Sequence, residues 1–251
     1  LHHRICRDRI VKWLEYKGRF REDVYTLDID WTVMARCMKE SSFRMRRFVS
    51  KWVSHHIAVG RMMGLREARL VNSCPRCGCA HENTLHVLRC HARSSRQQWK
   101  REVRKVKKWL VEVGTDPEIT RALEEVLRNY NRNHDFDTYT SSVPPPHVQA
   151  CLESQTRIGW TGFMEGLFAH EWAIQQSEYY LTQGSRRSGN RWAVELSKRL
   201  WKMIFAMWDH RNRAIFETEK AEAMSGLVPL KAAISRELEI GPRGLDPSFQ
   251  P

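Results

Sequence analysis

A short segment rich in cysteine and histidine constrains the fold of this chain more than any other feature. Cys74 and Cys77 form a Cys-x2-Cys pair, eight residues separate Cys77 from His86, and Cys90 follows His86 by four positions. The pair directs two thiolates to one point, and His and Cys at this spacing share one face of a helical turn. Three thiolates and one imidazole make a closed tetrahedral shell, which is typical of structural zinc sites. The sequence therefore predicts that Cys74, Cys77, His86 and Cys90 bind one structural Zn2+.

Neighbouring residues leave the membership of this ligand set open. Cys79, His81 and His91 are close enough in sequence to replace one of the four. We prefer the four because Cys79 follows the Cys-x2-Cys turn too closely, and His91 directly follows Cys90 and so points elsewhere. The chain has seven cysteines, four of them within 17 residues. This odd, clustered set indicates metal binding in a reducing compartment, not a secreted disulfide framework.

Hydrophobic periodicity predicts a mainly α fold, with a helical module around the zinc knuckle and a second helical subdomain after it. The clearest amphipathic helix spans residues 94–113, where one stripe is apolar and the opposite side is basic. Asp30 is the expected N-cap of an earlier helix. A small hairpin is possible around the cysteine cluster. Further helices are expected over residues 4–17, 41–57, 147–182 and 189–222, the third of them interrupted near Gly159, Gly162 and Gly166.

Three consecutive prolines from Pro144 to Pro146 mark a break in this helical pattern, because proline does not fit inside a helix. The break predicts how the chain is divided. We expect a basic zinc-binding helical domain at residues 1–130, a Pro-containing linker at 131–147, a helical C-terminal subdomain at 148–240 and a flexible tail at 241–251.

The net charge of +13 lies entirely in the first half of the chain. Residues 1–115 hold 26 Lys and Arg against 11 Asp and Glu, whereas residues 116–251 hold 16 against 18. Such an excess attracts polyanions through counterion release, and RNA or DNA is the expected partner. The expected nucleic-acid contacts are Arg76, Arg89, Arg101, Arg104, Lys105, Lys108, Lys51 and the ring of Trp52.

Plainer explanations compete with these assignments. The Lys100–Lys108 run is equally well a solvated helix face or a nuclear localisation signal, and Trp52 is more simply a core residue than a base-stacking ring. The sequence contains no Gly-rich phosphate loop and no polymerase Asp-Asp pair, so catalysis is not expected. No apolar run approaches the roughly 20 residues of a membrane helix, and no membrane partner is expected.

Two segments, residues 48–99 and 201–217, also carry a family resemblance. The second contains the pattern Trp-x-x-Arg-Asn-x-x-x-Phe, from Trp208 to Phe216. Together they resemble the zinc-binding domain that follows the reverse transcriptase in non-LTR (LINE-type) retrotransposon polyproteins. That family often has a proline after the last cysteine, where this chain has His91. The first segment matches through Lys51-Trp52, Cys74, Cys77, Gly78, Glu82, Thr84, His86-Val87-Leu88, Cys90 and Trp99.

The resemblance implies the C-terminal part of a retroelement protein, with the reverse transcriptase region of the same polyprotein upstream as a partner. In that family the domain is thought to assist binding of template or target nucleic acid. The first residue, Leu1, fits a fragment. The hypothesis is a non-catalytic, zinc-binding, nucleic-acid-binding module that is intracellular and nuclear. The alternatives are a zinc-stabilised protein-interaction scaffold and an inactive, truncated retroelement remnant.

Overall fold

The computed structural model describes residues 12, 29–66, 72–80, 82–132 and 144–240, and side chains only as far as residue 217 in the last range. The described residues form the expected mainly α fold without a strand, so the hairpin is not found among them. The predicted helix at 4–17 and the tail at 241–251 lie outside the described residues. The helices are α2 (Trp31–Glu40), α3 (Phe43–Val53), α4 (Gly60–Arg66), α5 (Thr84–Arg89), α6 (Arg93–Glu112), α7 (Pro117–Tyr130), α8 (Pro146–Ile158), α9 (Trp160–Glu165), α10 (His170–Thr182) and α11 (Gly189–Ile240).

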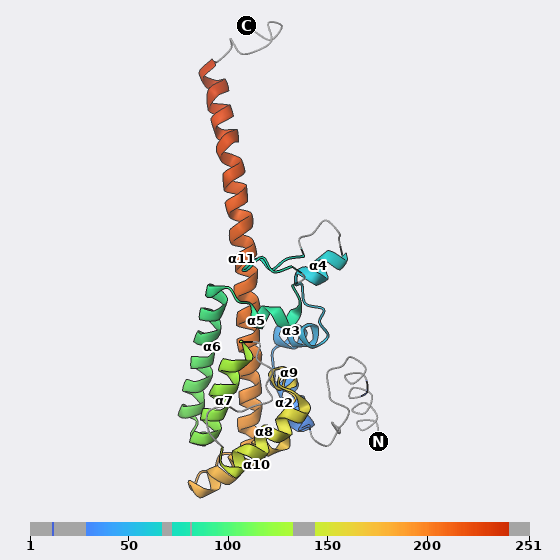
Figure 1. Ribbon diagram of the computed structural model, residues 1–251, viewed down its shortest axis with the longest axis vertical. Helices are drawn as coiled ribbons and strands as arrows, with labels where there is room; N and C mark the ends of the chain where they lie inside the picture. Colours follow the sequence, from blue (N-terminus) through green and yellow to red (C-terminus); the bar gives the residue numbers. More distant parts are fainter. Residues whose placement is uncertain (1–11, 13–28, 67–71, 81, 133–143, 241–251) are drawn as a thin grey trace.

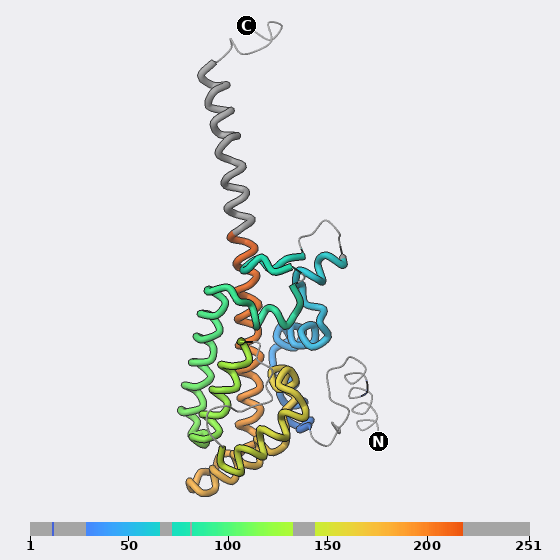
Figure 2. Tube along the Cα trace, in the orientation of Figure 1, coloured from blue at the N-terminus to red at the C-terminus, as the bar shows by residue number. Residues whose placement is uncertain are grey.

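Helix α11 organises the fold, and it contacts α2, α3, α5, α6, α9 and α10. In Figure 1, α6 and α7 lie along one side of α11, while α2 and α3 lie on the other side. Figure 2 follows the same path and shows in colour the part of α11 that these helices surround. The apolar face predicted for this helix is buried, and its members are Ala193, Leu196, Leu200, Met203, Ile204 and Met207.

Helix α6 forms nearly where the sequence predicts it, at Arg93–Glu112. Its apolar stripe packs against α7 and α11 because Trp99, Val103, Val106 and Leu110 all point into the core. The indole nitrogen of Trp99 donates a hydrogen bond of 2.8 Å to the carbonyl oxygen of Leu127 in α7. The burial of this stripe leaves the basic residues of α6 on the outer surface.

The helical stretch expected at 147–182, with an interruption near its glycines, is three helices, α8, α9 and α10, and Gly159 and Gly166 lie at the breaks. Gly159 has φ +92° and Gly166 has φ +96°, a region that other residues rarely adopt. A Cβ atom at Gly166 would lie 2.9 Å from Ser197 Oγ in α11, so this position also needs a residue without a side chain. The breaks fold α9 back against α8 and α11.

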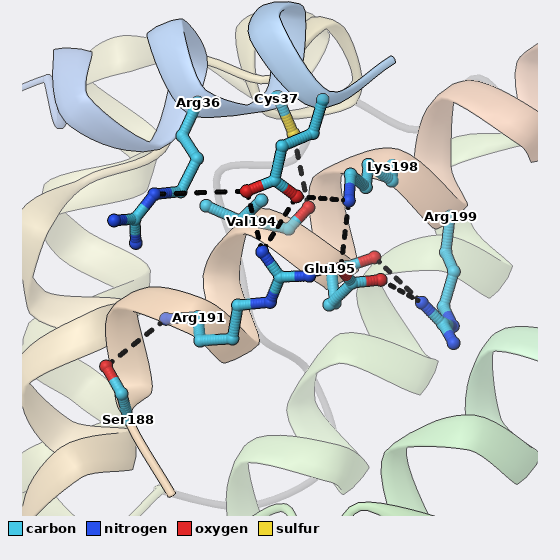
Figure 3. A network of polar contacts seen from close by, with 9 residues as sticks. Arg36, Cys37, Ser188, Arg191, Val194, Glu195, Lys198 and Arg199 are labelled. Atoms are coloured by element: carbon cyan, nitrogen blue, oxygen red, sulfur yellow. Dashed lines mark hydrogen bonds and ion pairs between the residues drawn. The ribbon is translucent and has the colours of Figure 1, made fainter. Parts of the chain in front are cut away.

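Helix α2 is joined to α11 by a network of charged groups, which Figure 3 shows from close by. The carboxylate of Glu40 in α2 accepts hydrogen bonds from Arg191 at 2.7 Å and from Lys198 at 2.6 Å, both in α11. Glu195 bridges the same two cations within α11. At the other end of α2, Asp30 is the N-cap, as predicted, and accepts from the backbone N–H of Thr32 and Val33.

The two expected helical regions share one hydrophobic core. Helix α11, which belongs to the expected C-terminal subdomain, packs on α2, α3, α5 and α6 of the first region. The structure therefore differs from two separately packed units, because proline breaks divide helices without dividing the core they build. In the described part of the chain, no helix combines the length and apolar character needed to cross a bilayer.

Candidate metal centre and basic groove

The first two candidate ligands lie on a tight turn between Cys74 and Gly78. The backbone N–H of Gly78 donates to the carbonyl oxygen of Cys74 at 2.8 Å, and the N–H of Cys74 donates to Cys79 at 2.8 Å. Gly78 has φ +71°, which lets the chain reverse directly after Cys77. This turn places both thiol groups on the same side of the loop.

The other two ligands are supplied by the short helix α5 and its end. Asn83 is the N-cap, and its side-chain oxygen accepts from the backbone N–H of His86 at 2.8 Å. Val87 and Leu88 are fully buried and fix the inner face of α5. His86 and the C-cap residue Cys90 are thereby presented to the cysteine turn, as their spacing predicted.

The four predicted ligand atoms converge on one point and could hold a metal ion. All of them lie within 4.8 Å of one another. Cys74 Sγ is 3.8 Å from Cys90 Sγ, and Cys77 Sγ is 3.3 Å from His86 Nε2. In a tetrahedral shell with bonds of about 2.0 Å to nitrogen and 2.3 Å to sulfur, neighbouring ligand atoms are about 3.5–3.8 Å apart. The observed separations fit that shell with little adjustment.

The thiol groups interact strongly with one another. A hydrogen bond with Cys90 lowers the pKa of Cys74, and the same contact raises the pKa of Cys90. Burial raises the pKa of Cys77. These contacts oppose ionisation of all three thiols at once, whereas a bound metal ion would favour the thiolate form of each.

Two of the spare ligands, Cys79 and His91, lie outside this cluster. Cys79 is exposed, and its thiol contacts the carbonyl oxygen of Ala80 at 3.5 Å. The His91 ring is exposed, and its centroid is 6.5 Å from that of His86. His81 lies outside the described residues. Among the described residues, the group able to hold an ion is Cys74, Cys77, His86 and Cys90.

A buried ion pair fixes the loop before α5 to helix α11. Glu82 is fully buried, and Arg211 is only 4% exposed. The Nε atom of Arg211 donates to both carboxylate oxygens of Glu82 at 3.1 Å, and its Nη1 atom donates to Ala58 at 3.2 Å. Glu82 also accepts from the N–H of Gly60 at 2.9 Å. The pair joins residues 129 positions apart and anchors the metal-binding loop on α11.

Arg76, predicted to contact phosphate, instead makes contacts within the protein. Its Nη1 atom donates to Ser95 Oγ at 3.0 Å, and its Nη2 atom donates to the carbonyl oxygen of Val87 at 2.9 Å. The side chain therefore ties the cysteine turn to α5 and to the start of α6. A residue between two ligands is drawn into these contacts because the turn packs directly on both helices.

A groove of about 960 Å3 lies beside the cluster, between α5, α6 and α7. The ligand His86 lines one end of it, and the aromatic residue Trp99 and the apolar Leu85 and Val103 contribute to its wall. Glu124 is the acidic residue among the described lining residues. Six cations line the same groove, and they are Arg89, Arg96, Lys100, Arg104, Arg128 and Arg132.

The groove contains two of the predicted phosphate contacts, Arg89 and Arg104, and not the other cations predicted on α6. Arg101 donates to Gln98 at 2.6 Å, Lys105 to Glu102 at 2.7 Å, and Lys108 lies 3.7 Å from Glu112. These three residues are exposed on another side of α6. Their partners on the same helix were visible in the sequence at spacings of three and four residues.

The predictions for α3 have different outcomes. Trp52 is 2% exposed and packs in the core, so the prediction that its ring stacks on bases is wrong. Its ring centroid is 5.9 Å from that of Phe48, which is also buried. Lys51 is exposed but does not line the groove. A tryptophan in an amphipathic helix is drawn into the core because it buries a large apolar area.

Sequence reasoning missed four basic residues of the groove as individual contacts: Arg96, Lys100, Arg128 and Arg132. Arg96, Lys100 and Arg104 recur every four residues, so a common helix face was detectable. Arg128 in α7 and Arg132 just after it are also four residues apart, but only the packing of α6 on α7 brings the two sets to the same groove.

Comparisons with known proteins give no relative. No protein-family model matches the chain, and no curated protein or solved structure matches it either. We therefore infer the function from the geometry of the candidate metal centre and of the groove.

Proposed function

We propose that this chain is a non-catalytic, zinc-binding module that binds RNA or DNA. The observation that carries the proposal is the basic groove next to the candidate metal centre. Six cations face one carboxylate there, and the ligand His86 lines the same groove. The metal would hold α5 in place, and the basic groups would bind the phosphate backbone.

The donor set favours zinc. Thiolate and imidazole ligands suit zinc, whereas magnesium and calcium prefer oxygen ligands. Three sulfurs and one nitrogen fill a tetrahedral shell and leave no position for water or substrate. Zinc would therefore have a structural role here. The stoichiometry of bound zinc in purified protein, measured by atomic spectroscopy, tests this assignment, and a Cys77→Ser variant is expected to lose the metal.

In the described part of the chain, the lack of ion pairs at three basic residues of the groove supports phosphate binding. None of the side chains of Arg96, Lys100 and Arg104 forms an ion pair with a described carboxylate, in contrast to Lys105 and Lys108. Unpaired cations on one helix face leave their charge available to a polyanion. Contacts of this kind position a nucleic acid without reading its bases.

The resemblance to the zinc-binding domain of LINE-type polyproteins supplies a biological context for the proposal. The acidic residue of its first segment, Glu82, and the arginine of its second segment, Arg211, form the buried pair described above. This contact joins the two segments that carry the resemblance. In that context, the reverse transcriptase region of the same polyprotein would be the adjoining partner.

Charge reversal inside and outside the groove tests the proposed function. The affinity of the zinc-loaded protein for a single-stranded and a duplex oligonucleotide is measured at several salt concentrations. We expect a steep fall with salt, and a loss of about tenfold or more in Arg96→Glu/Arg104→Glu. Lys105→Glu/Lys108→Glu carries the same charge change outside the groove and is the matched control. Flat salt dependence, or equal losses in both double variants, would contradict the groove as the binding site.

A protein-interaction scaffold is the second candidate, and one observation favours it. Phe216 in α11 is 67% exposed, so this helix carries a large apolar group outside the core that a protein partner could cover. A scaffold would retain zinc but would show no affinity for nucleic acid. The salt titration described above therefore separates the two candidates.

A further inference from the structure

A second pocket adjoins the basic groove and has a different chemical character. It has a volume of about 390 Å3, and its lining residues come from the end of α3, from α4 and from the start of α5. Its apolar lining comes from Val53, Val59, Met62, Leu65 and Leu85. The volume falls in the range of roughly 300–1,000 Å3 that is usual for pockets that bind small molecules.

The two cavities adjoin at α5. Asn83 and Leu85 line both of them, so a ligand that leaves the groove beside Leu85 would meet the smaller pocket. His55, His56 and Arg61 line the pocket, and none of its described lining residues is acidic. The described lining of both cavities is mainly basic or neutral, which suits a polyanion. The pocket has a larger share of apolar lining residues than the groove.

We infer that the groove and the pocket together bind single-stranded nucleic acid, with the backbone in the basic groove and an unpaired base in the pocket. This inference rests on the proposed function and specifies its ligand. A base in a duplex is stacked and paired, so only an unpaired base can turn away from the backbone into a separate pocket. A planar base needs apolar contact on its faces and polar groups at its edge, and the pocket offers both kinds of group.

The exposure of Leu65 is consistent with this role. Its side chain is 72% exposed at the mouth of the pocket, and it has no catalytic or metal-binding part in the fold. A base seated there would cover this apolar group. Leu181 in α10 is 75% exposed and lines neither cavity, so it offers a control of the same residue type and exposure.

The first experiment separates base contacts from phosphate contacts. The zinc-loaded protein is titrated with a labelled 12-nucleotide single strand, with an abasic strand that has the same phosphates, and with a duplex of the same sequence. We expect the intact strand to bind at least about fivefold more tightly than the abasic strand or the duplex. Leu65→Ser should weaken binding of the intact strand by about two- to fivefold and leave the abasic strand unchanged. Leu181→Ser should change neither.

The outcomes distinguish this inference from the proposed function. Equal affinity for intact and abasic strands, with the salt dependence and the effect of Arg96→Glu/Arg104→Glu retained, overturns the base pocket and leaves phosphate binding intact. A preference for the duplex overturns it in the same way. Absence of binding to all three oligonucleotides overturns both. Displacement of the strand by an acidic peptide at equal concentration would show that charge alone, and not a base, is recognised.

A second measurement locates the base directly and does not depend on affinity. A single strand containing 4-thiothymidine is irradiated in complex with the unaltered, zinc-loaded protein, and the crosslinked peptides are identified by mass spectrometry. We expect crosslinks within residues 53–65 or at residues 83–85, which line the pocket. Crosslinks confined to α6 and α7 would overturn the inference.

Discussion

The loop region that holds the candidate metal centre and the helical layer formed by α8, α9 and α10 are stabilised in different ways. In the layer, Phe163, Phe168 and Trp172 are all fully buried, and the ring centroids of Phe163 and Phe168 are 4.6 Å apart. In the loop region, α4 has seven residues and α5 has six, which is too short for helices to be stable alone. The comparison teaches that apolar packing builds the layer, whereas in the loop region the apolar contacts of short helices are supplemented by a buried ion pair and by a cluster of candidate metal ligands.

The treatment of buried polar groups shows the same contrast. In the layer, the neutral side chain of Gln155 is fully buried, accepts from the N–H of Ala169 at 3.0 Å and donates to Leu167 at 3.0 Å. In the loop region, the buried hydrogen bonds are made by a charged pair, Glu82 and Arg211. An amide is inexpensive to bury when its hydrogen bonds are made, but a charge requires its partner. The loop region is thus more sensitive to the loss of a single group.

Removal of the metal is expected to have the largest effect, and it should be local. Binding of structural zinc contributes on the order of 10 kcal/mol in small zinc modules, so Cys77→Ser or chelation should unfold the loop region. Hydrogen exchange of residues 72–90 should then accelerate strongly, while that of α8–α10 stays slow. Cys79→Ser is the control, because its thiol lies outside the ligand group. Uniform acceleration throughout the chain would show that the two regions do not differ in this respect.

Breaking the buried ion pair should have the next largest effect. Arg211→Met leaves the carboxylate of Glu82 buried without its cation, which costs about 3–5 kcal/mol of the free energy of unfolding. The double variant Glu82→Gln/Arg211→Met removes both charges and should recover part of the loss. Chemical denaturation measures both variants. If the double variant were as unstable as the sum of the two single changes, the contact would not be a coupled pair.

A substitution that creates a cavity in the helical layer tests the other side of the comparison. Met164 in α9 is 1% exposed, and Met164→Ala should lower the free energy of unfolding by about 2–5 kcal/mol. The variant should still bind one equivalent of metal, because no ligand or contact of the loop region is changed. Denaturation and metal content are measured on the same sample. A loss of metal together with a loss of stability would mean that the layer, and not the ligands, holds the loop region in place.

Features formed by residues close together in the sequence could be predicted, whereas features formed by distant segments could not. The convergence of the four candidate ligands and the apolar stripe of α6 depend on spacings of three to nine residues, and the structure contains both. The buried pair between Glu82 and Arg211 and the groove shared by α6 and α7 depend on packing between distant segments. Trp52 was assigned to base stacking by residue type, but its ring is buried, because type alone does not give the direction of a side chain. Arg76 was assigned to phosphate in the same way, and its side chain donates hydrogen bonds within the protein.

The smallest expected effect concerns His210, which lies half-buried in α11 where this helix meets the loop region. Burial lowers the pKa of His210, and the nearby Arg76, Arg213 and Arg101 lower it further. The unfolded chain therefore binds a proton at a higher pH than the folded chain does. Stability should fall as pH decreases below the ordinary histidine value of about 6.5 and level off below the lowered pKa.

The substitution His210→Gln removes this proton linkage. The melting temperature of the zinc-saturated variant should decrease less than that of the parent between about pH 7.5 and pH 5.5. His56→Gln, at an exposed position, controls for loss of metal in acid, because that loss would affect every protein alike. Identical pH profiles for the parent and His210→Gln would show that this histidine does not link stability to pH. A flatter profile in His210→Gln alone would show that burial of His210, together with the nearby arginines, makes this part of α11 sensitive to pH.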